Sequence, residues 1–164
     1  MLDENRRGIF MKNTTLCYIE KENKYLMLHR TKKKNDPNES KYMGIGGHFE
    51  EKESPLDCVI REAKEETGLT LENPTYRGIV TFVSDKYETE QMHLFTCQSF
   101  FGTLIECNEG ELTWVDKDKI KDLPMWQGDI IFLNLLEKNE PFFSLKLSYL
   151  GDNLVSAYLN GKRL

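Results

Sequence analysis

Apolar residues recur at every second position, or in short unbroken runs, through much of the chain, and polar or glycine-containing turns separate them. Such runs predict strands when they are rich in β-branched and aromatic residues, because successive side chains of a strand point to opposite faces. The polar turn at residues 20–24 joins the first two expected strands, and Gly151-Asp152-Asn153 joins the last two into a hairpin. The expected strands span residues 14–19, 25–30, 46–49, 75–83, 92–101, 112–116, 142–150 and 154–159.

The first segment with helical spacing begins at a serine and ends at a glycine. Ser54 followed by Pro55 predicts the start, with the serine hydroxyl as N-cap and the proline at the first helical position. Gly68 predicts the end, because glycine readily takes the left-handed conformation that follows a last turn. The apolar stripe expected to face the core consists of Leu56, Val59, Ile60, Ala63 and Thr67.

Apolar residues between Ile130 and Leu136 predict a second helix over residues 127–138, and residues 118–122 are expected to form one helical turn. Strands mixed with two helices predict an α+β or α/β sandwich. The length of 164 residues fits one domain, which we expect over residues 13–164. The polar residues 1–12 are expected to form a flexible lead, and Met11 is a second candidate for the start of the chain.

The composition is typical of a soluble globular protein, with 39% hydrophobic and 30% charged residues and a net charge of −5. This charge disfavours a long nucleic-acid partner, which needs a basic face. It does not disfavour a small nucleotide, because a bound metal can reverse the local sign. No apolar run is long enough to cross a membrane, and the cysteines form no C-x-x-C pair, so we expect a cytoplasmic protein with reduced cysteines. The oligomeric state stays open.

Three glutamates of the first expected helix, Glu62, Glu65 and Glu66, carry the candidate chemistry. Their spacing places them within about one turn of each other, where like charges repel and destabilise a helix. Divalent cations such as Mg²⁺ bind carboxylates and substrate phosphates, so a metal would remove the repulsion and hold a diphosphate. Arg61, four residues before Glu65, is placed to orient a carboxylate. A glutamate-rich helix facing water is the alternative interpretation.

The spacing of glycine, glutamate and arginine around this helix resembles the Nudix box, so the chain is similar to Nudix hydrolases. Softer similarities cover residues 14–162 and are closest to bacterial 8-oxo-dGTP diphosphatases of the MutT type. The resemblance implies an α/β/α sandwich with a mixed sheet, in which the box forms a loop–helix–loop element. The matching box positions are Gly47, Glu53, Arg61, Glu62, Ala63, Glu65, Glu66, Gly68 and Leu69.

The same resemblance implies a hydrolase that uses Mg²⁺ or Mn²⁺ and converts a nucleoside triphosphate to a nucleoside monophosphate and pyrophosphate. Glu62 is the first candidate for the base that takes the proton of the attacking water, and Glu66 is the second. Glu53 and Arg61 are expected to orient the carboxylates. The implied metal ligands are the Gly47 carbonyl, Glu62, Glu65, Glu66 and Glu109, with Glu111 as the alternative to the last.

Recognition of the base is expected from Trp126 and Asp129, which match the tryptophan and nearby acid that contact the base in purine-specific relatives. An indole can stack on a purine, and a carboxyl can pair with its edge. A core tryptophan followed by an aspartate at a helix N-terminus explains the same residues equally well. Met43 stands where relatives often have asparagine or isoleucine, and His48 stands where they commonly have lysine. Both are expected at the substrate site, and both weaken the case for 8-oxo-dGTP itself.

Other activities fit parts of the sequence. Tyr87, eighteen residues after the box, is typical of dinucleoside polyphosphate hydrolases, whereas residues 82–85 lack the proline that ADP-ribose hydrolases usually carry. A nucleotide-binding regulator without catalysis usually loses box carboxylates, and this chain keeps them all. The charged loop at residues 32–41 is expected to be solvated, with a basic rim over a polyphosphate as the alternative.

Overall fold

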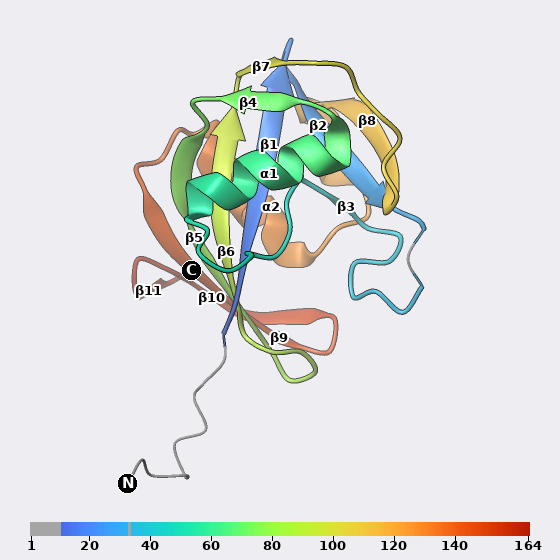
Figure 1. Ribbon diagram of the computed structural model, residues 1–164. Coiled ribbons are helices and arrows are strands. Elements are labelled where there is room, and N and C mark those ends of the chain that lie inside the picture. The colour runs from blue at the N-terminus through green and yellow to red at the C-terminus, as the bar shows by residue number, and fades with distance from the viewer. Residues whose placement is uncertain (1–10, 33) are drawn as a thin grey trace, which may run out of the picture.

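The computed structural model describes residues 11–32 and 34–164 (Figure 1). Residues 1–10 of the expected lead lie outside the described residues, and Lys12 already belongs to the first strand. The helices are α1 (Pro55–Thr67), the 3₁₀ helix η1 (Lys117–Asp122) and α2 (Gln127–Glu137). The strands are β1 (Lys12–Lys21), β2 (Lys24–Arg30), β3 (Tyr42–Met43), β4 (Thr70–Glu72), β5 (Thr75–Ser84), β6 (Glu90–Cys97), β7 (Ser99–Phe101), β8 (Gly110–Asp116), β9 (Phe143–Leu150), β10 (Asn153–Leu159) and β11 (Lys162–Arg163).

One large sheet with parallel and antiparallel pairs forms the middle of the molecule. Its strand order is β11-β10-β9-β5-β6-β1-β2-β3, with β8 also paired to β2. The β1–β6 and β5–β9 pairs are parallel. The β1–β2 and β9–β10 pairs are antiparallel, as the two predicted hairpins require. The mixed sheet expected from the sequence is therefore confirmed.

Strand β1 has a core on each of its faces, because its side chains alternate between them. Leu16 and Tyr18 belong to the core that α2 covers, with Phe132 of α2 among its buried residues. Cys17 and Ile19 belong to the core that α1 covers. Helix α1 lies across one face of the sheet and α2 lies behind the other (Figure 1). This arrangement is the predicted α/β/α sandwich.

Helix α1 begins and ends where the sequence predicts. The Ser54 hydroxyl accepts a hydrogen bond from the Asp57 backbone, and the Asp57 carboxylate accepts one from the Ser54 backbone. These two bonds satisfy N–H groups that a helix start leaves free. Gly68 ends the helix at φ 80°, where an L side chain would be strained. The box helix is thus bounded by interactions local in sequence.

The buried stripe of α1 differs from the prediction at two residues. Leu56 is 46% exposed, whereas Cys58, which the stripe omitted, is fully buried. The loop that precedes the helix folds back over β1 and covers Cys58, whose Sγ lies 3.4 Å from the Thr15 hydroxyl and 3.7 Å from the Gly47 carbonyl. Helical periodicity does not reveal a face that is buried by the chain's own loop.

Two expected strands have different bounds in the structure. Residues 46–49 form no strand: Ile45 and His48 make isolated bridges to β1, and the strand lies earlier, at β3. The two glycines bring the main chain against β1, where Gly47 accepts a hydrogen bond from Thr15 at 2.9 Å. The expected strand 92–101 divides into β6 and β7, and β7 pairs with β4, which was not predicted. Within residues 11–32 and 34–164, no helix is long and apolar enough to span a membrane.

Candidate active site

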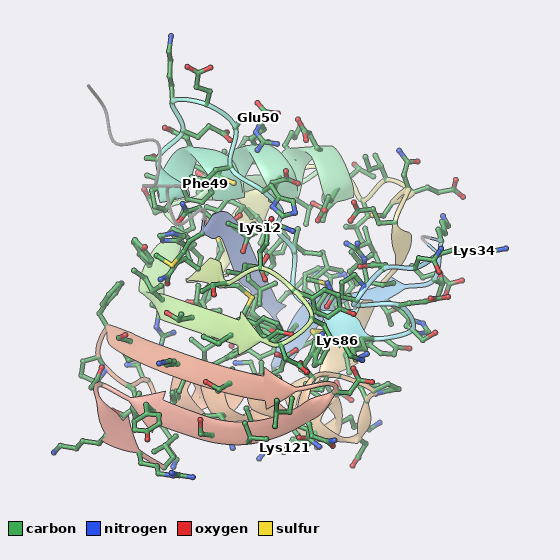
Figure 2. The ribbon with its side chains drawn as sticks, turned by 90° about the horizontal axis from the view of Figure 1, so that it is seen from below. Lys12, Lys34, Phe49, Glu50, Lys86 and Lys121 are labelled. Atoms are coloured by element: carbon green, nitrogen blue, oxygen red, sulfur yellow. The ribbon has the colours of Figure 1, made fainter. Side chains whose placement is uncertain are left out.

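A cavity of about 620 Å³ opens between the loop before α1, the start of α2 and the loop that follows β2. Box carboxylates line one part of it, and Trp126 and Asp129 line another. Lys12, Phe49 and Glu50, which are labelled in the view from below (Figure 2), line the cavity. The volume falls in the range that small-molecule sites usually have.

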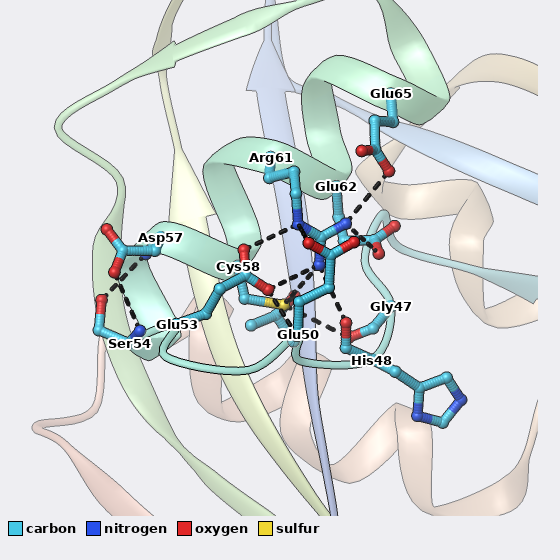
Figure 3. Close-up of polar contacts among 11 residues, drawn as sticks. Gly47, His48, Glu50, Glu53, Ser54, Asp57, Cys58, Arg61, Glu62 and Glu65 are labelled. Carbon is cyan, nitrogen blue, oxygen red and sulfur yellow. Dashed lines mark hydrogen bonds and ion pairs between the residues drawn. The ribbon is translucent and has the colours of Figure 1, made fainter.

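Arg61 lies at the centre of the hydrogen bonds and ion pairs of the box (Figure 3). Its Nε and Nη2 donate to both carboxylate oxygens of Glu53, at 2.7 and 2.8 Å. Its Nη1 donates to Glu62 at 2.8 Å and to Glu65 at 3.1 Å, and its Nη2 also donates to the His48 carbonyl at 3.0 Å. The paired bonds lower the pKa of the Glu53 carboxyl and raise the pKa of the guanidinium. Arg61 and Glu53 are therefore held together by paired bonds, and neither lines the cavity; their role in orienting the carboxylates stays a prediction.

Glu62 projects from α1 toward Gly47. A Cβ added at Gly47 would lie 2.5 to 2.7 Å from the Glu62 carboxyl group, so only glycine permits this approach. Burial raises the pKa of Glu62, and Arg61 opposes that shift. Both residues line the cavity. The Gly47 carbonyl accepts from the Thr15 backbone at 2.9 Å and from the Cys58 thiol, a weak donor, at 3.7 Å.

Glu66 and Glu109 meet in the cavity from distant parts of the chain. The Gly46 backbone donates to Glu66 at 3.3 Å. Burial raises the pKa of Glu66 strongly, and the charges of Glu109 and Glu62 raise it further. Glu109 is held from its other side by Arg30, whose Nη1 donates to it at 2.6 Å. The negative charge of three glutamates is thus concentrated here and only partly neutralised.

The donor set suits a hard divalent cation. Carboxylate and carbonyl oxygens are the ligands that Mg²⁺ and Mn²⁺ prefer, and a cation would relieve the repulsion that raises the pKa of Glu66. Across the described part of the chain, no three His, Cys, Asp or Glu side chains are already gathered into a metal-binding arrangement. In this structure Arg61 holds Glu62 and Arg30 holds Glu109. Each of these two bonds uses one carboxylate oxygen, so the second oxygen of Glu62 and of Glu109 would be available to a metal.

Three other predicted residues occupy different positions around the cavity. The Glu65 side chain is 59% exposed and contacts Arg61, and it does not contribute to the cavity wall. Met43 and His48 both line the cavity. His48 extends away from the carboxylates (Figure 3). The structure therefore brings together Glu62, Glu66, Glu109 and Gly47, and it leaves Glu65 at the side.

Trp126 and Asp129 are both buried and both line the cavity. Phe82 and Tyr149 contact the indole edge-on, and the Lys41 ammonium lies 4.6 Å from the ring centre. Asp129 is 8% exposed, and burial raises its pKa to about 8, which the Lys41 charge partly opposes. Trp126 belongs to the core, as one interpretation of the sequence has it, and both residues also line the cavity, while their contact with a base stays a prediction.

Several cavity residues were not predicted. Arg30 is buried and binds Asp36 through Nε and Nη2, at 2.8 and 2.6 Å, as well as Glu109. Asn38 accepts a hydrogen bond from the Trp126 indole. Glu90 lines the cavity, and burial raises its pKa. None of these residues belongs to a spacing motif. Arg30, a charged residue within an apolar strand, was the one sequence feature that could have indicated a functional position.

Comparisons with known proteins identify the family to which this chain belongs. The model of the NUDIX domain family matches residues 11–136. The protein named "Uncharacterized Nudix hydrolase YvcI" of Bacillus subtilis is 33% identical over 136 residues, which are 80% of this chain and 82% of that protein. The "Oxidized purine nucleoside triphosphate hydrolase" of Danio rerio is 30% identical over 111 residues, which are 67% of this chain and 71% of that protein.

Among solved structures, the MutT protein of Bacillus halodurans superposes with a TM-score of 0.81 at 26% identity, over 93% of this chain and 99% of that one. The family match covers β1 to β8, α1 and nearly all of α2, and therefore includes every predicted site residue. The chain belongs to the Nudix family of pyrophosphohydrolases, and among solved structures it resembles MutT proteins.

Proposed function

We propose that this enzyme hydrolyses the triphosphate of an oxidised purine nucleoside to the nucleoside monophosphate and pyrophosphate, with Mg²⁺ or Mn²⁺. The observation that carries the proposal is the shared cavity. It exposes the carboxylates of Glu62, Glu66 and Glu109 together with Trp126 and Asp129. A nucleotide has the same division, with an anionic end that needs cations and an aromatic end that needs a largely apolar wall.

The metal would be held by Glu62, Glu66, Glu109 and the Gly47 carbonyl, with Glu65 as a further ligand if its side chain turns toward the cavity. When bound, such a cation neutralises phosphate charge and lowers the pKa of a coordinated water. Lys12 lines the same cavity and can contribute further positive charge toward the phosphates. Electrostatic stabilisation of this kind is the main contribution expected in phosphoryl chemistry.

The protein residues divide the remaining work. Glu62, our first candidate, takes the proton of the attacking water, and Glu66 is the second candidate. The water oxygen forms a bond to phosphorus while the bond from that phosphorus to the bridging oxygen breaks, and pyrophosphate leaves. Arg61 and Glu53 keep Glu62 in place through their paired hydrogen bonds. No covalent enzyme intermediate is needed.

The base would lie against Trp126 and Asp129. The raised pKa of Asp129, about 8, leaves its carboxyl neutral at physiological pH, so that it can both donate to and accept from a base edge. Burial of the carboxyl in an apolar wall makes such a bond more selective than it would be in water. The activity named for the zebrafish relative supports an oxidised purine as the substrate.

The test is a comparison of product release over a panel of nucleotides with each metal. The panel holds 8-oxo-dGTP, 8-oxo-dATP, the ordinary dNTPs, ADP-ribose and diadenosine tetraphosphate. We expect the highest kcat/KM for an oxidised purine, with pyrophosphate as product and no turnover in EDTA. A preference for an unmodified pyrimidine, or phosphate as the sole product, would overturn the proposal.

A dinucleoside polyphosphate is the second candidate substrate, and one observation favours it. Tyr87, on the loop between β5 and β6, lines the cavity and could stack on a second base. The Tyr87→Ala variant separates the two candidates. A selective loss of diadenosine tetraphosphate cleavage would support the second candidate substrate. Activity of the variant equal to that of wild type on both substrates would remove it.

A further inference from the structure

The loop between β2 and β3 has a defined structure at residues 36–41, although the sequence suggested a solvated segment. The Asp36 side chain is 6% exposed and bonded to Arg30, and its second carboxylate oxygen accepts from the Asn38 backbone at 3.1 Å. Backbone bonds from Glu39 to Asp36 and from Lys41 to Asn38, each 2.9 Å, close the turn. These contacts place Asn38 in the cavity wall.

The orientation of the Asn38 amide follows from its partner. The Trp126 Nε1–H donates to Asn38 Oδ1 at 2.8 Å. Because an indole can only donate, the amide oxygen must face it, and the amide NH₂ must lie on the other side. Among the described residues, no group accepts a hydrogen bond from this NH₂. The cavity therefore contains a hydrogen-bond donor that is held in place and has no protein partner.

A second unpartnered group lines the same cavity. The Asp129 side chain makes no hydrogen bond to any of the described residues, although the residue is 8% exposed. Because no fully buried side-chain oxygen or nitrogen of the described residues lacks a hydrogen-bond partner, the Asp129 carboxyl is open to the cavity that it lines. Trp126 binds Asn38 through its indole, and its backbone carbonyl accepts from the Asp129 backbone at 3.0 Å. One tryptophan thus joins the loop that carries the free amide to the helix that carries the free carboxyl.

We propose that Asn38 determines base specificity, with its amide NH₂ donating to a carbonyl oxygen of an oxopurine while Asp129 pairs with a ring or exocyclic nitrogen. The proposal rests on the proposed function, since it places a nucleotide base in this cavity. A donor and a carboxyl that lack protein partners complement the carbonyl and N–H groups of an oxopurine edge. An amino group in place of the carbonyl would oppose the amide NH₂ with another donor.

The Asn38→Asp variant tests this assignment with little change of shape. It keeps an oxygen that can accept from Trp126 and removes the NH₂ donor. Asn38→Ala removes both groups. Glu39→Ala is the matched control, because Glu39 is exposed in the same turn and does not line the cavity. Thermal unfolding of each variant shows whether the turn stays folded.

The first measurement is calorimetric binding of 8-oxo-dGMP and dAMP without metal, which isolates the base from the phosphate chemistry. We expect wild type and Glu39→Ala to prefer 8-oxo-dGMP. Both Asn38 variants should bind 8-oxo-dGMP about tenfold more weakly, with the dAMP affinity unchanged within about twofold. Equal affinity of wild type and Asn38→Asp for 8-oxo-dGMP, or no binding of it to wild type, would overturn the inference.

The second measurement separates the inference from the proposed function. It is hydrolysis of 8-oxo-dGTP by the same variants with Mg²⁺. Loss of 8-oxo-dGMP affinity in the Asn38 variants, together with a wild type that hydrolyses no nucleoside triphosphate, would support the inference and reject the proposed function. Efficient hydrolysis by wild type, with unchanged kcat/KM in both Asn38 variants, would reject the inference and leave the proposed function intact.

Discussion

At the scale of residues, the site depends on charges that are grouped but unequally neutralised. Arg61 forms a bidentate pair with Glu53 and also bonds to Glu62, so this side of the box is balanced. Glu66 has only a backbone N–H at 3.3 Å and lies close to the charge of Glu109. Like charges in a half-buried position favour either protonation or a cation. The balanced side positions the box, and the unbalanced side is where a metal would bind.

The first prediction concerns Glu66 and Glu65, which differ by one position in sequence and strongly in environment. Glu66→Gln should lower kcat by about 100-fold or more, because it removes charge from the cavity. It should also raise stability without metal at neutral pH, since the wild-type carboxyl has a pKa of about 9 in the fold and ionises more readily in the unfolded chain. Kinetics and urea unfolding measure the two effects. Near-normal Mg²⁺-dependent turnover in Glu66→Gln would contradict its assignment as a metal ligand.

Glu65→Gln is the companion variant. A smaller loss of kcat than in Glu66→Gln is expected if the side chain keeps the exposed position on Arg61 seen here. An equal loss would show that Glu65 turns into the cavity when metal and phosphates bind.

The second prediction concerns the pH dependence of stability through Asp129. Its pKa is about 8 in the folded protein and near its ordinary value in the unfolded chain, so the unfolded state loses its proton first as pH rises. Between these two pKa values the free energy of unfolding of the wild type should fall by about 1.4 kcal/mol per pH unit from this group. Asp129→Asn removes that fall, so the variant gains on the wild type as pH rises.

Urea unfolding of wild type and Asp129→Asn at pH 5, 6 and 7 measures this difference. Parallel stability profiles for the two proteins over that range would show that the carboxyl is ionised in the folded state.

At the scale of elements, α1 and the loops around it position the chemistry. The helix is fixed by its capping box at one end and by Gly68 at the other. The loop before it brings Gly47 against Glu62, and the turn at residues 36–41 reaches Trp126. Loop residues on a rigid scaffold commonly carry the functional groups of enzymes.

The third prediction tests the cap of α1. Ser54→Ala should lower the free energy of unfolding by about 1 kcal/mol, because the Asp57 backbone N–H loses its acceptor. Ser54→Thr keeps a hydroxyl and serves as the control. The kcat of folded Ser54→Ala should stay within about twofold of wild type, because the cap positions the whole helix and not one carboxylate. Equal stabilities of the alanine and threonine variants would show that the cap contributes little.

At the scale of the whole molecule, the cavity draws its wall from segments far apart in sequence. Arg30 of β2 connects Asp36 with Glu109, and a further bond connects Asn38 with Trp126, 88 residues along the chain. A chain of hydrogen bonds and ion pairs therefore runs from Trp126 to Glu109. The cavity carboxylates come together only when the chain is folded. Cation binding should therefore be coupled to folding.

The fourth prediction follows from that coupling. Mg²⁺ at about 100 times its Kd should stabilise the fold by about 2.7 kcal/mol and raise Tm by roughly 5–10 °C, because the unfolded chain has no comparable site. K⁺ at equal ionic strength is the control. Glu66→Gln should reduce the Mg²⁺-dependent shift. A shift of the same size with K⁺ alone, or in Glu66→Gln, would indicate general charge screening in place of a site.

The sequence by itself determined the features that depend on local interactions. The bounds of the box helix could be read directly, because each is set by interactions within one turn. Ser54 and Asp57 act at the start of α1, and Gly68 acts at its end. The alternation of apolar residues placed most strands, and the box spacing indicated the family that the comparisons confirm. These signals need no knowledge of distant neighbours, because capping and periodicity act over a few residues.

The tertiary structure alone decided the features that depend on contacts between distant segments. Leu56 is exposed, whereas Cys58 is buried between Thr15 of β1 and the loop that carries Gly47. Glu65 faces Arg61, whereas Glu66 lines the cavity. The sequence does not reveal this difference, because the two residues are adjacent and carry the same side chain. The pairing of Asn38 with Trp126 arises only when the β2–β3 loop folds against the start of α2. Such contacts leave no periodic signal, since each partner satisfies the other through space.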